Sequence, residues 1–450
     1  MSIYKDCDIR GVYGSELTTD DMLRIGRAIA GMLDGREILV GGDFRTHTPV
    51  LKAALLDGLL QGGASVIDLG QLPTPAIYFA KRTLHTYACA QVTASHNPAS
   101  YNGLKLMLGD RPVTPDVIRS IQVSAESTQS PYKLGTCKSE NIMPAYETML
   151  MSACGCRIGK LKVLVDAGNG AMGEIAPRII QKLGFEVVEL FCTIDGRFPD
   201  RDPNPAVVTN LAAVCEKMRE VGADIGASFD GDGDRVVFID ADGKPLLAEE
   251  GLCIFIQALM QPEDSVVYDI KCSSIVKDAI LHGGGIPVME RSGHAFIRSN
   301  FLERGSCLAG EVSGHFFFRE LGADDGLYAL IRMCEILCRA QMPLRKLLGS
   351  VRYTAITPDI RVRADQAQID SAFEQMQIWA NARQDAVLSM LDGMRLEFTD
   401  GAWVLLRRSV TEPAMTLRLE TADSLRLHAL IGECAAWIPA VADALFAFFK

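Results

Sequence analysis

The apolar positions divide most of the chain into three similar units. In each unit a short β-branched run ends at polar or small residues, a helix-like segment follows, and a second apolar run comes next. The paired runs lie at residues 37–40 and 64–67, 162–165 and 184–188, and 265–268 and 285–288. Strand–helix–strand order with continuously apolar strands is typical of a covered, largely parallel sheet. The pattern predicts three related α/β domains, each βαβ-based with a mixed sheet.

The C-terminal part follows a different pattern. Residues 365–380 have a helical period, residues 393–419 alternate as strands do, and a closing helix is expected from residue 423 to the end. This combination is typical of a smaller α+β domain. Polar stretches separate the units and place the expected domains at residues 1–145, 146–246, 247–354 and 355–450.

Composition and charge narrow the function classes. With 48% hydrophobic and 22% charged residues, the sequence is typical of a globular protein with ample core. The net charge of −11 argues against general affinity for nucleic acids or membranes, so cations that hold an anionic ligand must be concentrated locally. No apolar signal segment opens the sequence, and charged residues and a proline interrupt the apolar stretch 430–449. Thirteen scattered cysteines favour reduced, buried thiols, so a cytoplasmic location is expected.

The first candidate site is a serine loop at residues 93–105. Two turn dipeptides, Asn-Pro and Asn-Gly, follow the serine and predict an exposed loop for Ser95. A serine beside His96 and within reach of Lys105 can act as a nucleophile or carry a phosphate. Taken alone, the same residues also fit a surface turn with an incidental serine.

The second candidate site is an aspartate loop. Asp230, Asp232 and Asp234 alternate with glycines between two apolar runs, so their carboxylates can converge on one hard cation if the loop curls. An EF-hand is excluded, because its sixth position is Arg235 instead of glycine and its twelfth is Ala241 instead of glutamate. Three protein ligands leave positions open for a phosphate oxygen, which suits Mg²⁺.

Two further loops carry weaker signals. Glu311, Ser313 and His315 place an acid, a hydroxyl and an imidazole on a turn between apolar runs, which suits sugar hydroxyls and proton transfer. Residues 407–413 combine arginine, two hydroxyls and a turn, which can cradle a phosphate. Each of these loops alone also fits an ordinary surface turn.

Together the four loops, in this order and spacing, resemble the α-D-phosphohexomutase superfamily, and the bacterial phosphomannomutase/phosphoglucomutase branch is the nearest fit. The resemblance covers essentially the whole chain and implies four domains around one central cleft. It implies that Ser95 is the phosphoserine and that Asp230, Asp232 and Asp234 bind Mg²⁺ together with the phosphate on Ser95. The expected reaction interconverts the 1- and 6-phosphates of mannose or glucose through a hexose 1,6-bisphosphate, which turns end for end.

The resemblance also implies roles for other residues. Glu311 and Ser313 would contact sugar hydroxyls, and His315 would move the proton of the attacking hydroxyl. The phosphate that is not transferred would be held by Arg407, Ser409 and Thr411. The remaining active-site positions of the family correspond to Arg10, Lys105, Arg235, Lys271 and His294, with His96 beside the phosphoserine. A phosphosugar is the expected ligand, and a monomer or weak dimer is the expected state.

Three residues depart from the family pattern. Cys7 stands where an aromatic residue commonly precedes Asp-Ile-Arg-Gly, and Arg408 and Val410 stand where the phosphate loop usually has smaller or more turn-prone residues. Valine tolerates a positive φ poorly, so this loop is expected to differ in shape. Arg408 is expected to compensate through a second charge-assisted contact with phosphate.

Two alternatives remain beside a mannose or glucose phosphate mutase. A phosphoglucosamine mutase usually has glutamine between the glutamate and serine of the loop that corresponds to residues 311–315, here called the sugar loop, whereas this chain has Val312. A catalytically inactive sugar-phosphate-binding protein is disfavoured, since Ser95 and all three loop aspartates are present. Mannose and glucose present the same 3- and 4-hydroxyls to Glu311 and Ser313, so the sequence does not decide between them.

Overall fold

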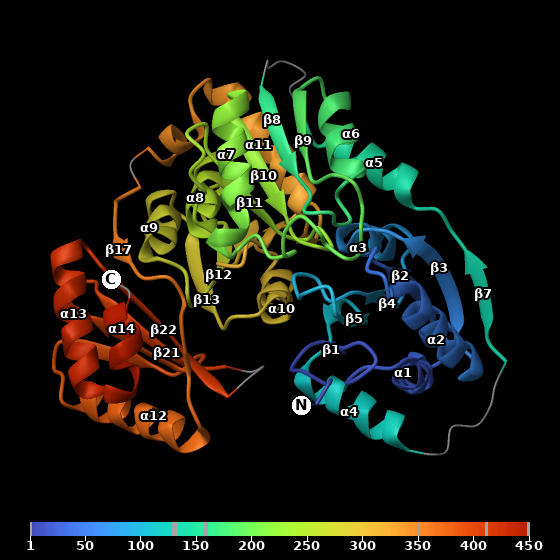
Figure 1. The fold of residues 1–450 in the computed structure, drawn as a ribbon, viewed down its shortest axis with the longest axis horizontal. Helices are drawn as coiled ribbons and strands as arrows, with labels where there is room; N and C mark the ends of the chain where they lie inside the picture. The colour runs from blue at the N-terminus through green and yellow to red at the C-terminus, as the bar shows by residue number, and fades with distance from the viewer. Residues whose placement is uncertain (1, 128–133, 156–160, 350, 410–412, 448–450) are drawn as a thin grey trace.

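Four separate sheets organise the chain in this computed structural model, which describes residues 2–127, 134–155, 161–349, 351–409 and 413–447. We number the four units domains I to IV in chain order. Figure 1 shows them following one another around an arc, from domain I in blue to domain IV in red. Three α/β domains and a C-terminal antiparallel-sheet domain confirm the predicted fold class.

Domain I contains a mixed seven-stranded sheet with the order β1-β5-β4-β2-β3-β7, and β6 pairs with β5. Its strands are β1 Ile9–Val12, β2 Glu37–Gly42, β3 Ser65–Gln71, β4 Ala88–Val92, β5 Tyr101–Leu108, β6 Arg111–Pro112 and β7 Thr136–Ser139. Its helices are α1 Thr19–Leu33, α2 Thr48–Gln61, α3 Thr74–Thr83 and α4 Pro115–Glu126. The predicted pair β2 and β3 is parallel, and the antiparallel strand β5 returns the chain beside β4.

Domains II and III repeat the parallel pair on smaller sheets, ordered β11-β10-β8-β9 and β13-β12-β14-β15-β16. β8 pairs with β9, and β12 with β13, in the predicted parallel orientation. The strands are β8 Lys162–Asp166, β9 Glu186–Leu190, β10 Ile225–Phe229, β11 Val236–Ile239, β12 Ser265–Asp269, β13 Ile286–Glu290, β14 Leu308–Gly310, β15 Phe316–Phe318 and β16 Ala323–Asp324. The helices are α5 Met143–Ser152, α6 Ile175–Lys182, α7 Ala212–Val221, α8 Ala248–Leu259, α9 Ser274–His282, α10 His294–Arg304 and α11 Gly326–Ala340.

Domain IV is an antiparallel sheet covered by helices. Its strands are β17 Ala355–Ile356, β18 Ile360–Arg363, β19 Ala386–Ser389, β20 Met394–Phe398, β21 Trp403–Arg408 and β22 Ala414–Thr421, and its helices are α12 Gln366–Asn381, α13 Ser424–Trp437 and α14 Ala442–Ala447. The prediction of one unbroken closing helix was wrong. Helix α13 ends at Trp437 and a short 3₁₀ turn begins at Pro439, because proline lacks the N–H that would continue the helix.

The apolar cores show which domains pack tightly together. One continuous cluster of buried side chains runs through domains I, II and III, and it includes Ile77, Tyr146, Phe229 and Leu330. Domain IV has a cluster of its own around Trp379. Its contact with domain III contains a small apolar patch of Ile270, Trp403 and Leu405, together with several charged groups. The first three domains therefore form one body, to which domain IV is attached mainly through polar contacts.

Strand ends place the four predicted loops. The serine loop follows β4, the aspartate loop follows β10, the sugar loop follows β14, and Arg407 lies at the end of β21. Ligands of open α/β sheets bind beyond the carboxyl ends of the strands, and the first three loops occupy such positions. Among the described residues, no helix is both long enough and apolar enough to cross a membrane.

Candidate active site

Ser95 is buried, which corrects the expectation of an exposed loop. Its side chain has no exposed area, and its Oγ donates a hydrogen bond of 2.7 Å to Asp230 Oδ2 of domain II. The turn dipeptides do place the serine on a loop, but the aspartate loop covers it. The serine also has a φ of +49°, a backbone state that costs free energy in a residue other than glycine. The fold therefore holds the Ser95 hydroxyl in one defined position against Asp230.

The three aspartates of domain II converge as predicted. All three are fully buried, and one carboxylate oxygen from each lies within 4.8 Å of the other two. The loop curls because Gly233 adopts a φ of +81° and donates its N–H to Asp230 Oδ1 at 2.9 Å. Asp232 Oδ1 is buried without a hydrogen-bond partner among the described residues, whereas Asp234 Oδ1 lies 3.3 Å from His315 Nε2. Buried carboxylate oxygens that lack donors fit a hard divalent cation.

The charges of this cluster are strongly coupled. Burial, with Asp232 and Asp234 close by, raises the pKa of Asp230 to about 8. Lys105 on β5 donates from Nζ to Asp232 Oδ2 at 2.8 Å and also to Asp234. Although burial opposes its charge, these aspartates raise the pKa of Lys105 well above its ordinary value. Lys105 therefore remains a cation at the centre of the site.

The sugar loop of domain III folds against the aspartate loop. His315 Nδ1 lies 2.8 Å from Glu311 Oε2, and Ser313 Oγ donates to the same oxygen at 2.9 Å. On the other side of the ring, His315 Nε2 lies 3.3 Å from Asp234 Oδ1. Burial and Arg235 lower the pKa of His315, but Asp234 and Glu311 outweigh them and raise it to about 9. The imidazole is therefore mainly protonated at neutral pH.

Four other predicted residues surround this centre. Arg235 Nε lies 3.7 Å from Asp230 Oδ2, and the His294 ring stacks on His315 at a centroid distance of 5.6 Å. Arg10 donates to Asn97 Oδ1 of the serine loop at 2.6 Å. His96 is partly buried, its Nδ1 has no partner among the described residues, and burial lowers its pKa well below the ordinary value.

Lys271 and Arg407 lie at the junction of domains III and IV. Lys271 Nζ forms a 2.6 Å ion pair with Asp359, and Arg407 forms a 2.7 Å ion pair with Asp392. Asp392 also accepts a 2.9 Å hydrogen bond from the backbone N–H of Ser292. Ser409 is described and makes a contact of its own, whereas Thr411 and Val410 lie outside the described residues.

Arg408, for which we expected a second phosphate contact, makes its contacts within domain IV. Its guanidinium forms a 2.7 Å ion pair with Asp370 on helix α12 and lies 4.4 Å from the centroid of the Phe373 ring. Successive side chains of a strand point to opposite faces. Arg407 and Arg408 are the last two residues of β21, so they cannot both face the same ligand.

Comparisons with known proteins agree with this geometry. Models of the phosphoglucomutase/phosphomannomutase α/β/α domains I, II and III match residues 1–131, 150–243 and 249–353. The chain belongs to this family. The phosphohexomutase is 35% identical over 433 residues to a phosphomannomutase/phosphoglucomutase of Pseudomonas putida. This match spans 94% of this chain and 92% of the relative. It is 34% identical over 428 residues to a phosphoglucomutase of Neisseria gonorrhoeae, covering 93% and 92% of the two chains.

Solved structures extend the comparison to the fold. A phosphoglucomutase/phosphomannomutase family protein of Burkholderia thailandensis superimposes with a TM-score of 0.89 at 33% identity, covering 98% of this phosphohexomutase and 97% of the relative. An N-acetylphosphoglucosamine mutase of Aspergillus fumigatus, in complex with GlcNAc-6P and magnesium, has a TM-score of 0.55 at 14% identity over 82% of this chain and 92% of its own. The latter shows a shared fold alone.

The phosphohexomutase also has an arginine clamp that sequence reasoning missed. Arg45, which follows β2 and is 1% exposed, donates from Nη2 to the carbonyl oxygens of Ser95 and Asn97 at 2.7 and 2.6 Å. Its Nη1 donates to Pro98 O at 2.8 Å, and Asp43 lies 3.2 Å from its Nε. The signal was an Asp-Phe-Arg sequence after a predicted strand, in the same position as the other loops. Asp324, 3.5 Å from His315 Nε2, was missed too and had no local signal.

We expect Arg45→Lys to lower kcat by about 100-fold with little change in KM, because a lysine cannot hold several carbonyls at once and a shift of about 1 Å in the reacting group has a cost of this order. Steady-state kinetics with a hexose 1-phosphate measure the effect. Arg27→Lys, an exposed arginine on α1, is the matched control. Equal kcat in the two variants would mean that the clamp does not position Ser95.

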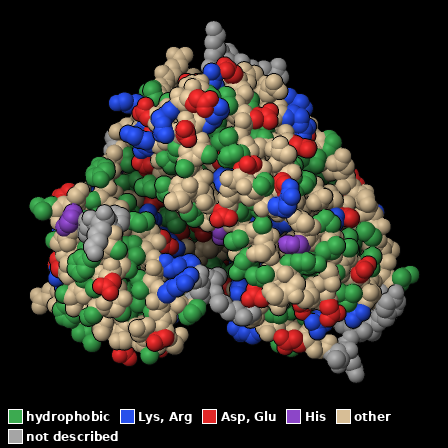
Figure 2. Space-filling model, viewed as in Figure 1, with side chains coloured by type: hydrophobic (Ala, Val, Ile, Leu, Met, Phe, Trp, Pro, Cys, Tyr) green, Lys and Arg blue, Asp and Glu red, His purple; other side chains and the backbone are tan. Residues whose placement is uncertain are grey.

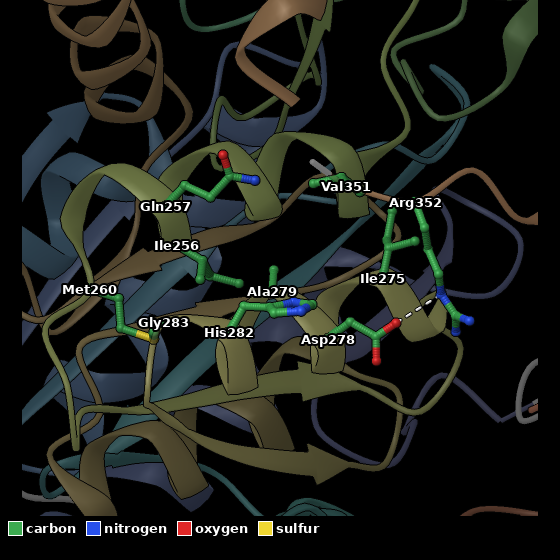
Figure 3. Close-up of a pocket in the computed structure, with 10 residues that line it drawn as sticks. All are labelled: Ile256, Gln257, Met260, Ile275, Asp278, Ala279, His282, Gly283, Val351 and Arg352. Carbon is green, nitrogen blue, oxygen red and sulfur yellow. Dashed lines mark ion pairs between the residues drawn. The ribbon is translucent and has the colours of Figure 1, made fainter. Parts of the chain in front are cut away.

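The surface of the phosphohexomutase is hollowed between domain IV and the other three domains. Figure 2 shows a deep hollow between domain IV and the other domains, with acidic and histidine side chains in its depth. A separate pocket of about 300 Å³ lies between α8, α9 and residues 351–352 (Figure 3). It has an aliphatic wall and a 2.8 Å ion pair between Arg352 and Asp278. None of the predicted site residues lines it, so it is separate from the candidate active site.

Proposed function

We propose that this phosphohexomutase interconverts hexose 1-phosphate and hexose 6-phosphate, of mannose or glucose, through a phosphorylated Ser95 and a hexose 1,6-bisphosphate. The observation that carries the proposal is the 2.7 Å hydrogen bond from Ser95 Oγ to Asp230 inside the buried aspartate cluster. It places a nucleophilic hydroxyl directly on a site that fits a divalent cation. The relatives named phosphomannomutase/phosphoglucomutase and phosphoglucomutase support these substrates.

Asp230, Asp232 and Asp234, with a phosphate oxygen on Ser95, would hold Mg²⁺, which when bound neutralises charge on the phosphoryl group. The magnesium-bound mutase of similar fold supports the choice of cation. Lys105 and Arg235 lie on the same carboxylates, so they would take up charge on the remaining phosphoryl oxygens. Phosphoryl transfer needs mainly such positioning and charge neutralisation.

The free hydroxyl of the sugar would attack phosphorus as the bond from phosphorus to Ser95 Oγ breaks. Its proton must leave, and we assign its acceptance to the neutral form of His315, the minor form near neutral pH, whose ring Glu311 and Asp234 hold from both sides. Glu311 and Ser313 would bind sugar hydroxyls. Arg10, His96 and His294 line the same centre.

The phosphate that is not transferred would bind Arg407, Ser409 and Thr411, with Lys271 beside them. In this structure Arg407 forms an ion pair with Asp392, and Lys271 forms one with Asp359. A dianionic phosphate would therefore have to replace or join these carboxylates. This exchange couples binding of the sugar phosphate to the contact between domains III and IV, since Asp392 also accepts from Ser292.

We expect Arg407→Ala to raise KM for the hexose phosphate by about tenfold or more, since it removes a charged hydrogen-bond donor to phosphate. Arg408→Ala should change KM less than about twofold, because its guanidinium lies on Asp370 of α12. Because both variants remove one arginine from the end of β21, each serves as the control for the other when KM is measured in the same assay. A larger effect at Arg408 than at Arg407 would contradict this assignment of the phosphate ligand.

A coupled mutase assay on mannose 1-phosphate, glucose 1-phosphate and glucosamine 1-phosphate tests the proposed function. We expect turnover of mannose or glucose phosphates that depends on a trace of the hexose 1,6-bisphosphate. Turnover of glucosamine 1-phosphate alone would indicate the phosphoglucosamine branch. Binding without turnover of any of the three would indicate an inactive sugar-phosphate-binding protein.

A further inference from the structure

A second cationic pocket lies at the junction of domains I and III. It has a volume of about 340 Å³, within the range of about 300–1,000 Å³ that is usual for small-molecule sites. Domain I contributes helix α3 with the residues that follow it and the turn after β5, and domain III contributes α10 and residues 321–322. None of the residues to which we assign a role in the mutase reaction lines it.

Two residues that line this pocket carry a buried donor without a partner among the described residues. Arg298 on α10 is 4% exposed, and its Nη1 is buried without a hydrogen-bond partner among the described residues. Its Nε donates to Gly322 O at 3.3 Å, and its guanidinium lies 3.9 Å from the centroid of the Tyr78 ring. Thr86 Oγ1 is likewise buried and unpartnered. A buried donor without an acceptor costs about 1–3 kcal/mol, so two such donors on residues that line one cavity indicate a ligand that they could reach by a small side-chain rotation.

The charge of the pocket is positive. Lys81, Arg82 and Arg298 line it, and Asp110 is the one carboxylate in its lining. The Asp110 side chain is fully exposed and lies 3.8 Å from Lys81 Nζ, so solvent screens this pair. In a chain with a net charge of −11, such a local excess of cations favours an anion.

We propose that this pocket binds a phosphate group, either free or carried by a small metabolite. Lys81, Arg298 Nη1 and Thr86 Oγ1 donate to the phosphate, and Tyr78 and Leu302 form the wall for any organic part. The site is independent of the function proposed above. Because its walls belong to two domains, a bound ligand stabilises the junction of domains I and III.

Isothermal titration calorimetry with inorganic phosphate tests the site on the full chain. We compare the natural protein with Lys81→Gln, Thr86→Val and the control Lys217→Gln, which removes a half-buried charge from α7. The natural protein and the control should bind phosphate at the active site and at this pocket. Lys81→Gln and Thr86→Val should weaken one of the two sites by about tenfold or more, since each loses a donor to a charged group.

Folding of the variants is checked by thermal melting without phosphate. Thr86→Val removes an unpartnered hydroxyl and keeps the side-chain shape, so its Tm should not fall. Identical phosphate stoichiometry and affinity in all four proteins would overturn the proposal, and the cations would then only join the two domains. Such a result would leave the coupled mutase assay, and therefore the proposed function, unaffected.

A second titration with hexose 6-phosphate distinguishes the two sources of the phosphate group. If a metabolite is the ligand, Leu302→Ala should weaken hexose 6-phosphate at this pocket by about threefold or more and leave inorganic phosphate unchanged, because only the organic part loses apolar contact. Equal affinities in Leu302→Ala and the natural protein identify free phosphate. If Lys81→Gln binds inorganic phosphate and hexose 6-phosphate as tightly as the natural protein does, neither ligand binds at this pocket.

Discussion

Replacing Ser95 with alanine should lower kcat by about 10⁴-fold or more and leave the protein folded. The hydroxyl is the proposed phosphate carrier, and removal of a catalytic nucleophile has effects of this order or larger in other enzymes. The structural loss is one buried hydrogen bond to Asp230, worth about 1 kcal/mol. Stopped-flow or steady-state mutase kinetics measure kcat, and thermal melting shows whether the variant is folded.

Ser100→Ala is the matched control, because Ser100 lies on the same loop and is exposed. The natural protein should also contain a peptide that includes Ser95 and is heavier by one phosphate, and Ser95→Ala should lack it. Wild-type kcat in Ser95→Ala would remove the phosphoserine from the mechanism. Loss of activity in both variants would show damage to the loop instead of loss of the nucleophile.

Asp232→Asn should reduce affinity for Mg²⁺ by at least about 100-fold and lower kcat/KM by a similar factor. Asp232 Oδ2 already accepts from Thr74 at 2.6 Å and from Lys105 at 2.8 Å, so its free oxygen Oδ1 is the one left for a cation. Even partners outside the ligand set change metal affinity by about 10–100-fold, and a lost carboxylate should reach the upper end of that range. Titration calorimetry with Mg²⁺ measures affinity separately from turnover.

Asp242→Asn, an exposed acid in the turn after β11, controls for the change of charge. Excess EDTA should abolish turnover of the natural protein, and Mg²⁺ should restore it. Full activity in EDTA would show that the buried aspartates do not serve a metal. In that case Lys105 and Arg235 would be the main charge partners of the phosphoryl group.

Local sequence patterns predicted the parts of the site that depend on local structure. The spacing of Asp230, Asp232 and Asp234 was sufficient because a curled loop with Gly233 brings alternate side chains together. The three strand pairs of domains I to III followed from continuous apolar runs, and the alternation in residues 393–419 predicted β20, β21 and β22 of domain IV but not β17, β18 and β19.

Other features depended on parts of the chain far apart in sequence. Ser95 is buried by the aspartate loop of domain II, and no property of its own loop indicates that cover. Arg45 holds the serine loop from about fifty positions away, and only the folded sheet brings β2 beside β4. The position of Arg408 was predictable from strand alternation, but the family pattern of the phosphate loop led to a different expectation.

The separate core of domain IV has a consequence for how such proteins can change. Because the apolar cluster around Trp379 does not merge with the one shared by domains I to III, replacing residues of that cluster should leave the packing of the other three domains intact. Arg407 and Ser409, the proposed holders of the substrate's second phosphate, belong to domain IV, whereas Ser95 and the three aspartates are buried in domains I and II. The binding of the second phosphate can therefore evolve, or be grafted from a relative, with domain IV while the residues proposed for phosphoryl transfer stay in place.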